Sequence, residues 1–238
     1  LIFRNADRIL VLSSQFKSKL RERGFDVPVD VETTTVDEDL LEGFDLDTAL
    51  KERKRADQDH ILFLSRLIEE KGIREFLESL RLLKQWGREF KATVAGDGPR
   101  REWMENTVEE MGLRSRVDFP GYLTGDSKRE IYQRATLYCL PSHEEGMPNS
   151  VLEAMAFGLP VVSTPVGGLE DLFETVKFGE IVPVGESESL ATAMSNCGIE
   201  SQTWERTARR NYQHARQRFL APSVADRLSS YYGRILSR

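Results

Sequence analysis

The stretch LYCLPSHEEGMPNSVLEAMAFGLPVVST, residues 137–164, decides the fold of this chain. Two short apolar runs, Leu137–Leu140 and Val161–Thr164, enclose a turn and a helical pattern over residues 150–157. Both runs are nearly uniformly apolar or β-branched instead of alternating with polar residues, which is typical of strands covered on both faces. A strand, a helix and a second strand in this order predict two parallel strands joined by a crossover helix.

The same alternation extends along most of the chain. Four further runs have the composition of buried strands: Ile61–Ser65, Ala92–Ala95, Val117–Phe119 and Glu180–Val184. Helical patterns lie between or after them, over residues 100–111, 127–134 and 187–197 and around Ile73, Phe76, Leu77, Leu80 and Leu83, which share one helical face. The sequence therefore predicts an α/β fold with a Rossmann-like, doubly wound parallel sheet, in which ligands bind beyond the carboxyl ends of the strands.

The two ends of the chain do not follow this alternation. Residues 1–30 read as a remnant of a preceding domain, with a strand at Arg8–Ser13 and a helix at Ser14–Arg23. Residues 31–58 are polar and acidic with weak periodicity, so we expect a linker there before the main domain at 59–200. Residues 201–238 are helical in pattern and rich in Arg, and should pack outside the sheet or reach toward the preceding domain. Because the chain starts at Leu1 and not at Met, we expect a piece of a longer protein.

Composition argues against several functional classes. The chain has 33 basic and 39 acidic residues and a net charge of -6, which argues against a general nucleic-acid binder. Cys139 and Cys197 are too few and too far apart for a disulfide framework, and His60, His143 and His214 show no metal-ligand spacing. No run is long and apolar enough to cross a bilayer and no signal peptide opens the chain, so we expect a cytoplasmic protein without a metal.

Two carboxylates mark the candidate site. Glu145 and Glu153 flank the turn Gly146–Asn149 and a helix start near Ser150, where free amides and the helix dipole suit a phosphate. On one helix the two acids would lie ~12 Å apart, which exceeds the ~5–9.5 Å separation of glycoside hydrolase pairs. Carboxylates that bind hydroxyls on either side of a phosphate site suggest a nucleotide sugar as the ligand.

Each acid also has an ordinary structural reading. The segment Ser150–Glu153 matches a capping box, so Glu153 could serve only to cap the helix. Glu145 could be a solvated loop acid, and its neighbour Glu144 has an equal claim to the site. Both alternatives stay open at this stage.

Further candidates lie at the same predicted sheet edge. Arg66 follows a strand and Lys71 precedes a helix, which places two cations where an anionic ligand binds. The turn Gly96-Asp97-Gly98-Pro99 follows the next strand, and Gly167-Gly168 follows another. Each signal alone is also typical of solvated charge or a tight turn, but together they indicate one ligand site.

These segments resemble a known family. Glu145–Glu153 resembles the E-x7-E motif of the retaining GT-B glycosyltransferases of family 4, the glycosyl transferases group 1. The segment from Arg66 to Lys71-Gly72 is similar to their R-x-x-x-EKG element, and Val94–Pro99 to their GDGP turn. The resemblance runs from about Ala6 to Phe219. It departs from the family pattern at Ser65, where a Gly is common, and at Val31–Asp37, where a PNG-hydrophobic-D signature is missing.

The resemblance implies two facing Rossmann-like domains, of which this chain is the C-terminal, donor-binding one plus the last strand and helix of the acceptor domain. It implies transfer of a hexose-type sugar, with retention and without a cofactor or required metal, from a UDP-, GDP- or ADP-sugar. The acceptor would be a glycan or a lipid-linked molecule, as in polysaccharide biosynthesis, and would need the rest of the N-terminal domain. Two roles stay open for the Arg-rich tail: peripheral association with the inner face of the membrane, or a merely solvated helical face.

The resemblance also assigns roles. Arg66 and Lys71 would bind the diphosphate and stabilise charge on the leaving nucleotide, Glu145 would contact the transferred sugar, and Glu153 would hold the ribose hydroxyls. Further donor-binding residues would be Gly96, Asp97, Gly98, Tyr122, Gly146, Met147, Pro148, Asn149 and Ser150. Two other functions stay open: a nucleotide-sugar epimerase of the same fold, and a binding module that has lost catalysis.

Overall fold

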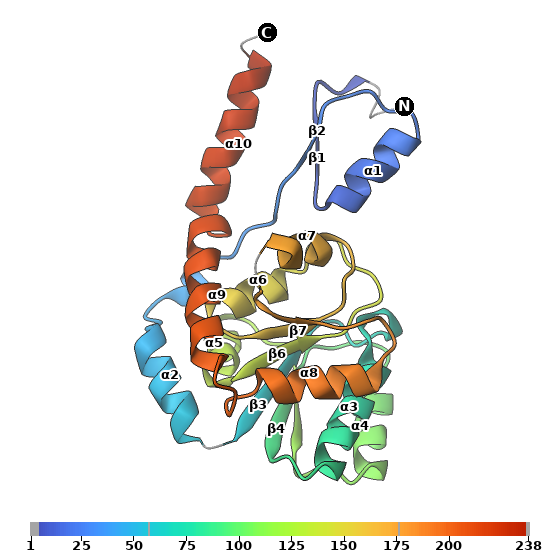
Figure 1. Cartoon of the computed structure of the whole chain (residues 1–238), viewed down its shortest axis with the longest axis vertical. Helices are drawn as coiled ribbons and strands as arrows, with labels where there is room; N and C mark the ends of the chain where they lie inside the picture. Colours follow the sequence, from blue (N-terminus) through green and yellow to red (C-terminus); the bar gives the residue numbers. More distant parts are fainter. Residues whose placement is uncertain (1–4, 57, 176, 237–238) are drawn as a thin grey trace.

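The computed structural model describes residues 5–56, 58–175 and 177–236. Its centre is a six-stranded, wholly parallel sheet with the strand order β5-β4-β3-β6-β7-β8 (Figure 1). The strands are β3 (Asp59–Leu64), β4 (Phe90–Ala95), β5 (Val117–Gly121), β6 (Leu137–Leu140), β7 (Val161–Ser163) and β8 (Gly179–Ile181). The predicted doubly wound parallel sheet is confirmed, and β6 has the predicted bounds.

The winding of the chain sets the position of the site. From β3 the chain moves outward to β4 and β5, then returns to β6 on the other side of β3 and moves outward again to β7 and β8. The topological switch point therefore lies between β3 and β6, which pair through Ile61 with Leu137 and Leu62 with Tyr138. A parallel sheet leaves a crevice beyond the carboxyl ends of the strands at such a point.

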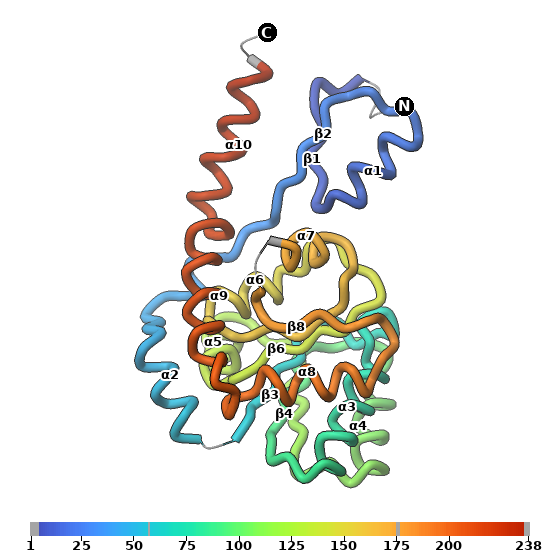
Figure 2. The backbone as a smooth tube through the Cα atoms, viewed as in Figure 1, coloured from blue at the N-terminus to red at the C-terminus, as the bar shows by residue number. Residues whose placement is uncertain are grey.

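Helices cover both faces of the sheet, as Figure 2 shows. One layer contains α3 (Ile73–Gln85), α4 (Arg101–Glu110) and α8 (Ser187–Cys197), with α3 in contact with both others. The other layer contains α2 (Leu46–Arg55), α5 (Gly125–Arg134), α6 (Asn149–Ala156) and α9 (Trp204–Arg218). Because both faces are covered, the central strands are mostly apolar, as in Ile61–Leu64 of β3 and Leu137–Leu140 of β6.

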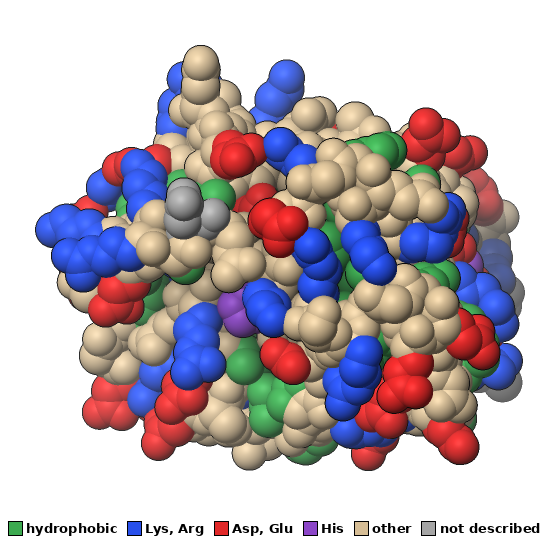
Figure 3. Space-filling view, turned by 90° about the horizontal axis from the view of Figure 1, so that it is seen from below, with side chains coloured by type: hydrophobic (Ala, Val, Ile, Leu, Met, Phe, Trp, Pro, Cys, Tyr) green, Lys and Arg blue, Asp and Glu red, His purple; other side chains and the backbone are tan. Residues whose placement is uncertain are grey.

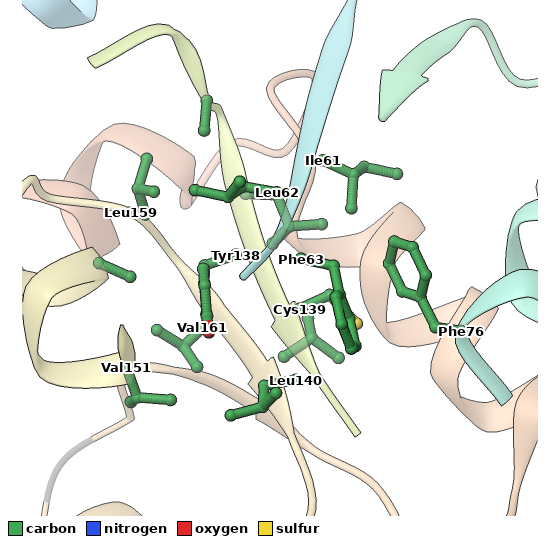
Figure 4. Close-up of a cluster of buried hydrophobic side chains, with 14 of the residues drawn as sticks. Ile61, Leu62, Phe63, Phe76, Tyr138, Cys139, Leu140, Val151, Leu159 and Val161 are labelled. Atoms are coloured by element: carbon green, nitrogen blue, oxygen red, sulfur yellow. The ribbon is translucent and has the colours of Figure 1, made fainter. Parts of the chain in front are cut away.

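The core shows this double coverage directly (Figure 4). Phe63 of β3 packs against Phe76 of α3, with ring centroids 4.9 Å apart. Tyr138 of β6 reaches toward α6, where its hydroxyl meets the Ser150 hydroxyl at 2.7 Å. Each such large side chain contributes about 1.5–3 kcal/mol by burial. Cys139 is a free, fully buried thiol, and burial raises its pKa.

The N-terminal segment forms a separate small unit beyond α7, Gly168–Thr175 (Figure 1). It consists of β1 (Ile9–Val11), α1 (Ser14–Glu22) and β2 (Val29–Val31), and the two strands pair in parallel. Helix α10 (Ala221–Leu236) extends beside this unit, and the Arg227 guanidinium binds the Glu32 carboxylate at 2.8 Å and 2.9 Å. The C-terminal helices thus lie outside the sheet and reach the N-terminal segment.

The sequence analysis did not predict β2, α2 or α7. The stretch read as a weakly periodic linker contains α2 and a 3-10 turn, η2 (Glu38–Leu41), and α7 begins at the glycine pair that was read only as a turn. These elements are short or polar, so they leave a weak signal in the sequence. Residues 1–4 and 237–238 of the predicted end segments lie outside the described residues.

Surface charge is mixed. Figure 3 shows the face opposite the N-terminal unit, where Lys and Arg side chains alternate with Asp and Glu and no single sign dominates. Among the helices of the described chain, none is long and apolar enough to cross a membrane.

Candidate functional site

A cavity of about 870 Å³ lies beyond the carboxyl ends of β3 and β6. Its lining brings together residues from five parts of the sequence, and most of the predicted site residues are among them. The lining comprises Asp37, Asp39, Leu40, Leu64, Ser65, Arg66, Lys71, Gly96, Asp97, Tyr122, Leu123, Thr124, Gly125, Lys128, Arg129, Leu140, Glu145, Pro148, Asn149, Ser150 and Glu153. The predicted sheet edge is therefore a real concave site.

At one end of the cavity Glu145 forms an ion pair with Lys71. The Lys71 Nζ lies 2.6 Å from Glu145 Oε1, and the Ser142 hydroxyl donates to the same oxygen at 2.7 Å. The Glu145 side chain is only 7% exposed. Its other oxygen, Oε2, has no hydrogen-bond partner among the described residues. Glu145 therefore presents one fixed and one available acceptor.

A glycine places Lys71 at this position. Lys71 ends the short 3-10 turn η3 (Glu69–Lys71), and Gly72 leaves it with φ +69°, a conformation that favours glycine. A Cβ on Gly72 would overlap the carbonyl oxygen of Pro141, the residue that follows β6. The close approach of Gly72 to Pro141 brings Lys71 against the loop that carries Glu145.

Glu153 lines the same cavity, and two donors bind its carboxylate. The Lys128 Nζ lies 2.7 Å from Oε1, and the Tyr132 hydroxyl donates to Oε2 at 2.8 Å. Burial, and then the charge of Glu153, raise the pKa of Tyr132 well above its usual value, so this phenol remains a donor. Both oxygens of Glu153 are thus occupied by donors from α5.

The capping-box alternative for Glu153 is wrong. Helix α6 begins at Asn149 with Pro148 as its N-cap, and no side chain caps it. The Ser150 hydroxyl instead contacts Tyr138, and Glu153 turns to α5. The first amides of α6, at Asn149 and Ser150, therefore face the cavity without a capping group, in the manner of an anion site.

The remaining predicted residues differ in placement. Arg66 is exposed on the cavity wall and forms no ion pair within residues 5–56, 58–175 and 177–236. Gly96 adopts φ +131°, and a Cβ there would overlap the carbonyl oxygen of Ser65. Asp97 lines the cavity beside it, and the Tyr122 ring is 78% exposed at the edge.

Three predicted donor-binding residues are not part of the lining. Gly98 packs against the backbone of Leu67, while Gly146 and Met147 lie behind the cavity wall, where the Gly146 carbonyl accepts from the Gly168 amide at 2.6 Å. Glu144, the alternative to Glu145, is exposed and outside the lining as well.

Several lining residues escaped the sequence analysis. The most informative is Lys128, the partner of Glu153, which lies on the first turn of a helix that was predicted from residue 127. The turn η2 also contributes, through Asp39 and Leu40, whose carbonyls accept from Arg129 at 2.8 Å and 3.1 Å. In the part of the chain that the structure describes, no group of three or more His, Cys, Asp and Glu side chains could hold a metal ion.

The fold is that of the GT-B glycosyltransferases. A sucrose-phosphate synthase from Thermosynechococcus elongatus superposes with a TM-score of 0.81 at 24% identity, over 99% of this chain and 60% of that one. Anabaena Alr3699/HepE in complex with UDP superposes with a TM-score of 0.81 at 21% identity, over 96% of this chain and 64% of that one.

The chain belongs to the family of glycosyl transferases group 1, whose model matches residues 47–214. It is 34% identical to 2-deoxystreptamine glucosyltransferase from Streptomyces kanamyceticus over 167 residues. This alignment covers 68% of this chain and 43% of that protein. It is 32% identical over 140 residues to the amylovoran biosynthesis glycosyltransferase AmsK from Erwinia amylovora, 56% of this chain and 34% of that protein. The chain thus spans less than half the length of these relatives.

Proposed function

We propose that this chain is the donor-binding, C-terminal domain of a retaining glycosyltransferase of family 4. The enzyme would transfer a hexose-type sugar from a UDP-, GDP- or ADP-sugar to a glycan or a lipid-linked acceptor. The observation that carries the proposal is the pair of carboxylates, Glu145 and Glu153, each held by a lysine in one cavity at the switch point. The family match and relatives such as the amylovoran glycosyltransferase support the same reading.

In this proposal the diphosphate lies between the two carboxylates, at the start of α6. The free amides of Asn149 and Ser150 would donate to phosphate oxygens, and the dipole of α6 would favour their charge. Arg66 and Lys71 would supply the positive charge that stabilises the leaving nucleoside diphosphate as its bond to the sugar breaks. We propose that these two side chains take this role without a metal ion.

The proposed role of Glu145 follows from its unequal oxygens. Oε1 is occupied by Lys71 and Ser142, so that oxygen is fixed in place. Oε2 would accept hydrogen bonds from hydroxyls of the transferred sugar. A negative charge at this position would also stabilise the oxocarbenium-like transition state of a transfer with retention. Glu153 would accept from the ribose hydroxyls at the other side of the diphosphate.

A nucleotide titration tests the proposal. The folded chain is titrated with UDP, GDP and ADP, once with EDTA and once with added Mg²⁺, and binding is followed by calorimetry and by thermal shift. We expect one nucleoside diphosphate to bind most tightly and EDTA to leave that affinity unchanged. The HepE structures with UDP and UDP-glucose favour UDP as the first candidate. A folded chain that binds none of the three would overturn the proposal. Epimerised nucleotide sugar, formed by the full-length protein without any acceptor, would replace the proposal by the epimerase.

A further inference from the structure

Lys128 is a cavity residue to which no motif assigns a role. Helix α5 begins at Gly125, directly after the N-cap Thr124, so Lys128 lies in the first turn. Its ammonium is 2.7 Å from Glu153 Oε1, and the side chains of Lys128 and Glu153 are only 23% and 10% exposed. A part-buried ion pair with such a short separation is worth more than one at the surface.

Helix α5 presents a second donor to the same carboxylate. Tyr132 lies one turn after Lys128, on the same helical face, and donates to Oε2. Its ring is fully buried and stacks on Phe157, with centroids 5.1 Å apart and an interplanar angle of 7°. Tyr132 is therefore fixed by packing, whereas Lys128 is the charged partner that faces the cavity.

No other cation of the cavity pairs with Glu153, and Arg66 forms no ion pair among the described residues. Lys71 pairs with Glu145, and Arg129 donates to the carbonyls of η2 and to Asp126. Among the described residues, Lys128 is thus the one cation that pairs with Glu153. Without it, a carboxylate that is 8% exposed would keep only the Tyr132 hydroxyl as a donor among the described residues, and its Oε1 would no longer be fixed.

We propose that Lys128 is a positioning residue that makes Glu153 a fixed acceptor for the ribose hydroxyls of the donor. The inference rests on the proposed function, since it assigns the ribose to Glu153. Each carboxylate oxygen has two lone pairs, so with one donor from α5 on each oxygen a second lone pair remains for a ribose hydroxyl. Two neighbouring hydroxyls match two fixed acceptors, which gives selectivity for ribose over deoxyribose in the nucleotide.

The test compares ribonucleotides with deoxyribonucleotides. UDP, GDP and ADP are each measured against their 2′-deoxy and 3′-deoxy forms, using the chain itself and the variants Lys128→Met, Lys128→Gln and Lys128→Arg. Lys51→Met is the control, because Lys51 is exposed on α2 and outside the cavity. Circular dichroism confirms that each variant is folded.

We expect the chain to prefer the ribonucleotide by about tenfold or more, as for hydrogen bonds to a charged group. In Lys128→Met and Lys128→Gln this preference should shrink at least about threefold, while Lys128→Arg and Lys51→Met should keep it.

Equal losses of ribonucleotide and deoxyribonucleotide affinity in Lys128→Met would overturn the inference and make Lys128 a phosphate ligand. An unchanged ribose preference would overturn it as well. In both cases the chain still binds nucleotide, so the proposed function stands. If the unmodified chain binds no nucleoside diphosphate, the proposed function itself fails and the inference fails with it.

Discussion

Glu145 and Glu153 line one cavity, yet their carboxylates are held differently. At Glu145 both donors, Lys71 and Ser142, act on Oε1 and leave Oε2 available. At Glu153 the donors are divided, with Lys128 on Oε1 and Tyr132 on Oε2. Glu145 is carried by a loop whose position depends on η3 and Gly72, whereas Glu153 lies inside α6 and against α5.

This difference suits two kinds of ligand group. A sugar ring that changes shape during transfer needs an acceptor with one available oxygen, which Oε2 of Glu145 provides. A ribose that only needs to be held needs two fixed acceptors on rigid elements, which α5 and α6 provide. The comparison predicts that the two ends of the cavity respond to different substitutions.

The largest effect is expected from Gly72→Ala, which acts at the Glu145 end. Alanine at φ +69° costs about 1–3 kcal/mol in the free energy of unfolding, and its Cβ would also overlap the Pro141 carbonyl. Gly87→Ala is the matched control, because Gly87 has φ +73° but no atom within 4 Å of an added Cβ. Urea unfolding should show a clearly larger loss for Gly72→Ala. Equal losses would mean that the contact with Pro141 does not position Lys71.

A smaller effect is expected from Lys71→Met. The loss of this ammonium should weaken nucleoside diphosphate binding by about tenfold or more, because a charge-assisted contact to phosphate is removed. Binding of the plain nucleoside should be unchanged, and so should the ribose preference set at the Glu153 end. Calorimetry with each ligand checks this. Equal losses for nucleoside and nucleoside diphosphate would remove Lys71 from the phosphate site.

The smallest expected effect is a change of stability with pH, and it comes from two histidines away from both carboxylates. Burial lowers the pKa of His60, helped by Arg134 and Lys91, and burial also lowers that of His214. The unfolded chain therefore takes up protons near pH ~6.5 that the folded chain takes up only at lower pH. Stability should be full above that pH and fall as the pH drops below it.

Urea unfolding at about pH 7.5 and about pH 5.5 measures this fall. His60→Gln combined with His214→Gln should flatten it. Asp59, whose pKa burial raises, acts with the opposite sign at lower pH. Neither histidine lines the cavity, so nucleotide affinity should not follow the same titration. An affinity that tracks the stability curve would mean that the two regions are coupled.

The sheet and its loops were predictable because their signals are local. Each strand is a short apolar run, each crossover helix has an apolar face, and parallel strands bring their carboxyl ends to one edge. The position of this carboxyl edge predicts from the sequence alone that Arg66, Lys71, Gly96 and Glu145 line one site. The family resemblance then assigned roles to residues that local patterns alone left ambiguous, above all Glu153.

Helix α2, strand β2 and the pairing of Lys128 with Glu153 could not be predicted from the sequence, for physical reasons. Helix α2 carries Arg53 on its buried face, where it donates to three backbone carbonyls, so its apolar periodicity is interrupted by a charge. Strand β2 has three residues with Asp30 in the middle. The pairing of Lys128 with Glu153 depends on the packing of α5 against α6 across 25 residues of sequence, and no local pattern encodes it.

The central claim is that Glu145 serves the sugar and Glu153 the nucleoside. The direct test measures Glu145→Gln and Glu153→Gln against a nucleoside diphosphate and the matching nucleotide sugar, for example UDP and UDP-glucose, by calorimetry on the folded chain. We expect Glu153→Gln to weaken both ligands by the same factor, and Glu145→Gln to weaken only the nucleotide sugar. If both variants weakened the nucleoside diphosphate equally, the two carboxylates would share one role and the claim would be wrong.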